Sequence, residues 1–140
     1  MNYLNWRYCD KRGGDFKIMQ ATEGDKILGY IALRINRYSK EYPVGIIADL
    51  LTLPGRPEVA HALTCFAEKY FRDQGVNIVE VFAVIGHPYE RVFERQYFIR
   101  SPTKHILFYT PFNLDKMELN DFMTAPPEKL HFEYGDLDTV

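Results

Sequence analysis

The segment from Val44 to Leu53, VGIIADLLTL, is apolar at almost every position and constrains the fold more than any other part of the chain. A strand that is apolar on both faces belongs inside a covered sheet, because a strand with one face in water alternates apolar and polar residues. A turn follows at Pro54 and Gly55, and apolar residues then recur at helical spacing as far as Phe71. The sequence therefore predicts a buried strand that enters a long helix through a short turn.

Turn and cap residues define the neighbouring elements. Gly24 and Asp25 suit a hairpin turn between two earlier strands, at 15–21 and 27–38. Pro57 fits the first position of the long helix, where its missing N–H leaves no bond unmade, and Gly75 fits the stop. The later patterns predict strands at 77–86 and 105–112, and a strand followed by an acidic turn within 130–138. They also predict a short helix from Pro88 and a polar loop with a partial helical turn at 113–129.

This order of elements predicts a mixed α/β (α+β) fold. Antiparallel hairpins flank one strand–helix–strand crossover, so the sheet is expected to be mixed but mostly antiparallel, with helices on its faces. At 140 residues the chain is expected to form one domain, 1–140.

Charge and cysteine content narrow the classes of function. With 17 basic and 19 acidic residues and no basic run, the chain lacks the clusters that nucleic-acid binding needs, so no nucleic-acid partner is expected. Cys9 and Cys65 are far apart, and the four histidines have no ligand spacing, so no disulfide framework or metal site is expected. The sequence has neither a signal-peptide core nor an apolar run of about 18 residues, which predicts a cytoplasmic protein without a membrane partner.

Several segments resemble the GNAT acyl-CoA N-acyltransferase superfamily. The hairpin 16–35 precedes a core strand, a turn and a long helix, and the second helix ends in VFERQYF at 92–98, where relatives commonly read aliphatic-Tyr-Glu-Lys-x-Gly-Phe. YLNWRY at 3–8 and FEYGDLD at 132–138 resemble the C-terminal half of a longer two-part subgroup. The resemblance implies a GNAT-like sheet that lacks the first strand and helix. The chain would then be a fragment missing an N-terminal domain, or a short relative that borrows an edge strand in a homo-oligomer.

The resemblance also implies a site for acetyl-CoA or another acyl-CoA. Free amides of Leu51, Thr52 and Leu53 would hold the pantetheine arm and the thioester carbonyl. Phe93 takes the place of a tyrosine that faces the sulfur in many relatives. The pyrophosphate would lie on the turn and helix N-terminus, formed by Gly55, Arg56, Pro57, Glu58, Val59 and Ala60.

The turn departs from the family pattern. Relatives carry more glycines there, whereas this chain has one glycine, Pro57 without an N–H, and the negative charge of Glu58. Arg56 could compensate as a direct phosphate partner. Two interpretations stay open: a weakened CoA site, and a plain strand–helix turn.

Two carboxylates and two tyrosines are candidates for acid–base chemistry. Asp49 stands in an apolar strand and Glu80 stands between two valines, so each could accept the proton of an amine. Tyr89, or else Tyr97, could replace Phe93 as the acid that protonates the leaving thiolate. The structural alternatives are ion pairs or sheet-rim positions for the two carboxylates, and core packing for the tyrosines.

The sequence thus favours an acyltransferase that moves an acetyl or acyl group from a CoA thioester to an unidentified amine, on a small molecule or a peptide. The alternative is a catalytically silent GNAT-like module that binds a protein partner or a small ligand. Net acidity disfavours a third possibility, an RNA-binding sheet.

Overall fold

The computed structural model describes residues 5–10, 12, 14–37, 42–102, 116–132 and 134–136. Its sheet has four strands in the order β1-β2-β3-β4. The first two pairings are antiparallel and the third, β3 with β4, is parallel. The strands are β1 (Phe16–Glu23), β2 (Lys26–Asn36), β3 (Val44–Thr52) and β4 (Ile78–Val81). The predicted mixed, mostly antiparallel sheet with β3 in its interior is confirmed.

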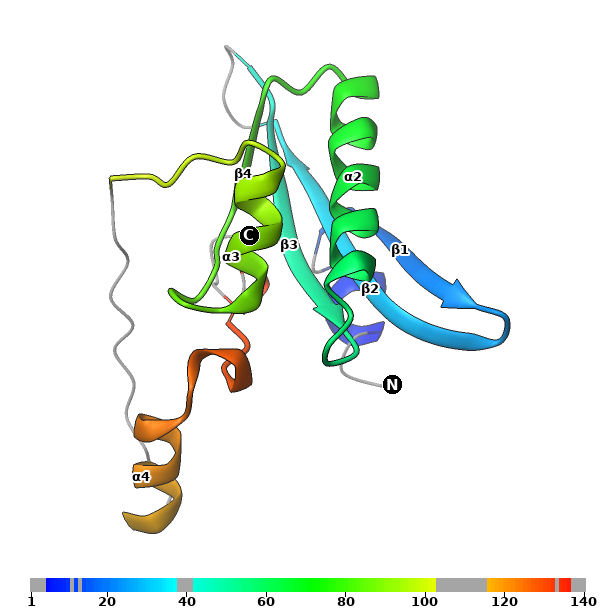
Figure 1. Ribbon diagram of the computed structural model, residues 1–140. Helices are drawn as coiled ribbons and strands as arrows, with labels where there is room; N and C mark the ends of the chain where they lie inside the picture. Colours follow the sequence, from blue (N-terminus) through cyan, green and yellow to red (C-terminus); the bar gives the residue numbers. More distant parts are fainter. Residues whose placement is uncertain are drawn as a thin grey trace.

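Two helices cover one face of this sheet. Figure 1 shows α2 (Pro57–Asp73) in front of β2 and β3, and α3 (Pro88–Arg95) in front of β4. Phe71 of α2 is 1% exposed, and it packs so closely on β3 that a Cβ at Gly45 would lie 2.8 Å from its ring. Both helices begin at the prolines that the sequence indicated, and α2 ends before Gly75, whose φ is 72°. The larger apolar core lies on this face.

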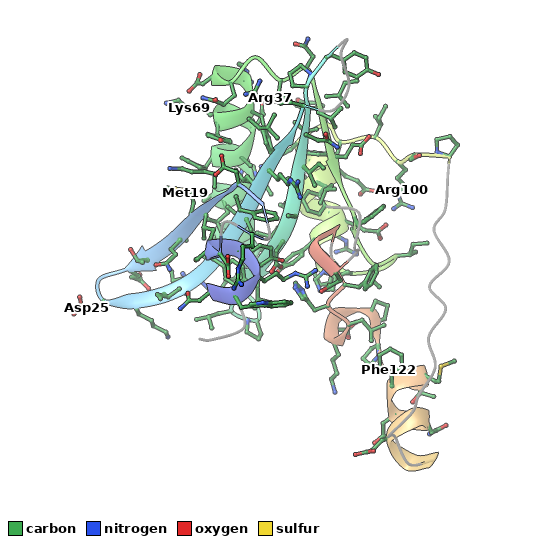
Figure 2. The ribbon with its side chains drawn as sticks, turned by 180° about the vertical axis from the view of Figure 1, so that it is seen from behind. Met19, Asp25, Arg37, Lys69, Arg100 and Phe122 are labelled. Carbon is green, nitrogen blue, oxygen red and sulfur yellow. The ribbon has the colours of Figure 1, made fainter. Side chains whose placement is uncertain are left out.

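The opposite face is covered by short turns. Seen from behind, the helical turn η1 (Asn5–Cys9) lies across the sheet (Figure 2). The ring of Tyr8 from η1 lies edge-on to Phe16 at 5.1 Å and joins a small cluster with Ala32 and Ala48. The turn η4 (Tyr134–Asp136) lies against β3 on the same side. Helices α2 and α3 thus share one face of the sheet, and the short turns η1 and η4 lie on the other.

The C-terminal part departs from the expected strands. The strand predicted at the start of 130–138 is wrong at 130–132, which are irregular, whereas the acidic turn expected after it agrees with the turn η4 at 134–136. Contacts across the sheet face position this segment, as described below. The expected strand at 105–112 lies outside the described residues. The region 113–129 contains α4 (Lys116–Thr124), which stands apart from the sheet in Figure 1, and the short turn η3 (Pro127–Lys129).

Candidate functional site

Strands β3 and β4 stop pairing halfway along β3. Their ladder runs from Val44–Ile78 to Ile47–Val81, whereas β3 continues to Thr52. Beyond Val81 the chain leaves the sheet toward α3, and the two strands diverge in Figure 1. The edge of β3 from Ala48 to Thr52 therefore has no β4 partner.

The amides along this part of β3 alternate between two edges. Leu53 donates to the carbonyl of Leu28 at 2.8 Å, and by alternation Leu51 also faces β2. Neither amide is thus available to a ligand, contrary to the expectation for these two residues. Leu50 and Thr52 turn to the other edge, where the Thr52 amide donates to the hydroxyl of Tyr89 at 2.9 Å.

The turn after β3 offers an open backbone. Gly55 has φ of 73°, and nothing in the described structure lies within 4 Å of the place where its Cβ would be. Among the described residues, no hydrogen bond is made by the amides of Gly55 and Arg56, whereas Val59 and Ala60 donate back to the Arg56 carbonyl. The Arg56 side chain pairs with the exposed carboxylate of Glu58. The turn can therefore present two amides and one guanidinium to an anion.

The predicted acid, Tyr89, lies at the unpaired edge. It is 9% exposed, and besides the Thr52 amide its hydroxyl lies 3.1 Å from Thr52 Oγ1. Its amide donates to the side chain of His87, which caps α3, and the two rings are 4.4 Å apart. Phe93 is 4% exposed and packs against Phe98, as a core residue does.

Asp49 lies on the face of the sheet away from α2 and α3. A bulge in β3 puts Asp49 opposite Ala32 and Ile47 opposite Leu33, which leaves Ala48 as the extra residue. The side chain of Asp49 is 7% exposed. Its Oδ2 accepts from the Tyr30 hydroxyl at 2.7 Å, and its Oδ1 lies 2.9 Å from Nε2 of His131. This predicted base is thus a fully engaged buried carboxylate.

The electrostatics of this cluster follow from Asp49. Its hydrogen bond raises the pKa of His131 above the ordinary histidine value, against the opposing effect of burial. Burial and then the Asp49 carboxylate raise the pKa of Tyr8. Burial and then the charge of His131 lower the pKa of His87. The two histidines are therefore close enough to influence each other.

The remaining candidates are placed differently. Glu80 pairs across the ladder with Ile46, so it lies on the same face as Asp49 but where β3 and β4 are still paired. Tyr97 is 93% exposed just after α3, away from the buried environment of Tyr89. His131 and Tyr30 were not singled out from the sequence. No local signal could have found His131, because it is 82 positions from Asp49.

The described residues contain neither a cluster suited to a metal ion nor a helix suited to a membrane. No cluster of three or more histidine, cysteine or acidic residues could hold a metal ion there. No helix in the described part of the chain is both long enough and apolar enough to cross a membrane.

Comparison with known proteins identifies relatives by fold. No protein-family model matches the sequence, and no curated protein matches it. A protein of Arthrobacter sp. FB24, provisionally named an acetyltransferase, has a TM-score of 0.57 and 26% identity over 78% of this chain and 74% of its own. The aminoglycoside acetyltransferase meta-AAC0020, from an uncultured soil metagenomic sample, has a TM-score of 0.53 and 23% identity over 68% of this chain.

The match spans 64% of the length of the aminoglycoside enzyme. A transcriptional regulator from Bacillus halodurans C-125 also shares the fold, with a TM-score of 0.61 and 13% identity over 78% of this chain and 75% of its own. Proteins that share this fold are thus named both as acetyltransferases and as a transcriptional regulator, so the fold alone does not determine the function.

Proposed function

We propose, from the premise that this chain has the fold of the GNAT superfamily, that it transfers an acetyl or other acyl group from a CoA thioester to an amine. The observation that carries the proposal is the end of the β3–β4 ladder at Ile47–Val81. Past that point β3 keeps an unpaired edge and runs directly into the open turn at Gly55 and the N-terminus of α2. A bound acyl-CoA would supply an activated acyl carbon at this edge.

The backbone around the turn would hold the phosphates. The amides of Gly55 and Arg56 and the partial positive charge at the start of α2 favour an anion there. Arg56 can turn from Glu58 to a phosphate at little expense, because their pair is exposed and water screens such pairs. Pro57 has no N–H to offer, so the phosphates would depend on fewer amides than the family pattern provides.

Tyr89 is the residue best placed to act as the acid. Its hydroxyl accepts from the Thr52 amide and lies 3.1 Å from Thr52 Oγ1, at the edge where a departing thiolate would take a proton. The Leu50 amide, on the same edge of β3, would be left for the acyl-CoA arm.

A second candidate function is a silent GNAT-like module that binds a partner domain or a small ligand. The observation that favours it is the engagement of the Thr52 amide by Tyr89, which fills one of the donors that an acyl-CoA arm would use. In this case the unpaired edge of β3 would be closed by Tyr89, and CoA would not bind.

Thermal unfolding and calorimetric titration with acetyl-CoA test the proposal. A ligand that binds only the folded chain stabilises it by about 2.7 kcal/mol at a hundredfold excess over its Kd. We expect saturable binding and a rise in Tm. No heat and no shift at millimolar acetyl-CoA would leave the silent module as the function.

Two arginines at opposite ends of α2 provide a matched control. Arg56 pairs with Glu58 and Arg72 pairs with Glu68, and both pairs are exposed. We expect Arg56→Ala to weaken CoA binding about tenfold, a loss of about 1.4 kcal/mol, because it removes a phosphate partner. Arg72→Ala should leave the affinity unchanged. Equal effects of the two variants would show that the N-terminus of α2 does not hold the phosphates.

A further inference from the structure

Both oxygens of the Asp49 carboxylate already have hydrogen-bond partners from this chain. Oδ2 accepts from Tyr30 and Oδ1 faces Nε2 of His131, and the side chain is 7% exposed. To take a proton directly, the carboxylate would have to lose the negative charge that both partners stabilise inside a buried site. Such a loss is unfavourable, because hydrogen bonds to an ionised group are stronger than those to a neutral one.

His131 is the accessible member of the pair. Its side chain is 38% exposed, and within the described residues its Nδ1 makes no hydrogen bond. A carboxylate bonded to one ring nitrogen fixes the orientation of the imidazole and strengthens the other nitrogen as a base. Asp49 and His131 therefore have the arrangement of an orienting carboxylate and a working base.

The C-terminal segment brings His131 to the unpaired edge of β3. Pro127 lies beside Gly86, 3.2 Å from where its Cβ would be, so the segment passes the start of α3. His131 acts electrostatically on His87, whose ring contacts Tyr89, and Tyr89 bonds to Thr52. The segment thus runs from the start of α3 to the Asp49 face of β3.

We propose that His131 accepts the proton of the acceptor amine and that Asp49 is its positioning residue. In the step, the amine nitrogen forms a bond to the acyl carbon while the carbon–sulfur bond breaks. The amine proton passes to Nδ1 of His131, and the thiolate takes a proton from Tyr89 or solvent. This inference rests on the proposed function and adds the C-terminal segment to the site.

Other groups around His131 modulate its protonation. Asp49 of β3 and Asp136 of η4 favour the charged imidazole, whereas burial opposes it. The charge of His131 in turn lowers the pKa of His87 at the start of α3, after the larger effect of burial. Asp136 also lies 3.9 Å from Arg7 of η1, and Glu128 of η3 acts on His87. Tyr8 of η1 and Tyr30 of β2 surround the same carboxylate, both able to donate to it. These groups act in opposite directions, and the hydrogen bond with Asp49, the largest effect, raises the pKa of His131.

The pH dependence of acyl transfer tests the inference. Acetyl-CoA is the donor, and sisomicin, a polyamine bound by one of the structural neighbours, and benzylamine are the probe amines. We expect His131→Gln to lower kcat/KM by about 10²-fold at pH 7.5, to leave the KM for acetyl-CoA unchanged, and to remove the acidic limb of the profile. Asp49→Asn should move that limb to lower pH, and NMR titration of His131 should show the same downward shift.

The controls separate catalysis from folding. Lys129→Gln is the control for His131→Gln, because it lies in the same segment. Asp25→Asn is the control for Asp49→Asn, because it makes the same substitution at the tip of the β1–β2 hairpin (Figure 2). Neither control should alter the pH dependence of kcat/KM. A uniform loss of activity at every pH in His131→Gln, or a kinetic limb that does not coincide with the NMR titration, would overturn the inference. So would CoA binding by the wild type without acylation of either amine. Absence of CoA binding would instead overturn the proposed function.

Discussion

The two faces of the sheet are built on different principles. Toward α2 and α3, side chains such as Phe71, Leu33 and Ile47 are at most 1% exposed and entirely apolar. On the other face, two short turns cover a small apolar cluster beside a buried carboxylate with polar partners.

This difference places most of the apolar core on the helix face and the buried carboxylate on the other face. Apolar burial stabilises without directional demands, so the helix face can be large and uniform. A buried carboxylate needs each oxygen paired, which ties β2, β3 and the C-terminal segment to one point on the other face. We therefore expect the largest losses of stability from substitutions on the helix face, and smaller losses from substitutions on the other face.

The largest effect on stability is expected at Phe71. Phe71→Ala leaves a cavity between α2 and β3 and should lower the free energy of unfolding by about 3–5 kcal/mol. Phe16→Ala removes a half-buried ring from the opposite face and should lose roughly half as much. Urea unfolding measures both. A larger loss at Phe16 would contradict the assignment of the main core to the helix face.

An intermediate effect is expected at Gly135. A Cβ there would lie 2.8 Å from the Ala48 carbonyl oxygen and in contact with the Tyr8 hydroxyl. Gly135→Ala should lower the free energy of unfolding by about 1–3 kcal/mol, because the added methyl group would collide with the Ala48 carbonyl and the Tyr8 ring, which cannot both move away. The double variant with Tyr8→Phe should recover part of the loss in a double-mutant cycle. Strict additivity would mean that Gly135 and Tyr8 do not pack together.

The smallest effect is expected from the pH dependence of the Asp49–His131 pair. Since its partner raises the pKa of His131 in the folded chain, the pair stabilises fully below the unfolded pKa of about 6.5. That contribution disappears as pH rises through the folded pKa. His131→Gln should thus lower Tm by a few degrees at pH 5.5 and less at pH 8.5, by calorimetry. A greater loss of Tm at pH 8.5 than at pH 5.5 would contradict an Asp49 contact that raises the pKa of His131 in the folded chain.

Sequence patterns predicted the elements better than they predicted the site. The apolar run of β3 and the prolines before α2 and α3 act locally, so both helices and the first three strands begin within a residue or two of expectation. The sequence also indicated Tyr89 as an alternative to Phe93. It did not indicate that the Leu53 amide pairs with Leu28, because an amide's partner depends on strand register.

By itself, the sequence determined a covered central strand, a proline-started helix behind it, and a lone carboxylate in that strand. Those features follow from residue spacing and backbone preference, which act over a few positions. Only the tertiary structure decided that β4 leaves β3 after Ile47, that a bulge sets Asp49 on the face without helices, and that His131 reaches it. The physical reason is that a buried charge is satisfied by whatever group the fold brings within 3 Å, however distant along the chain.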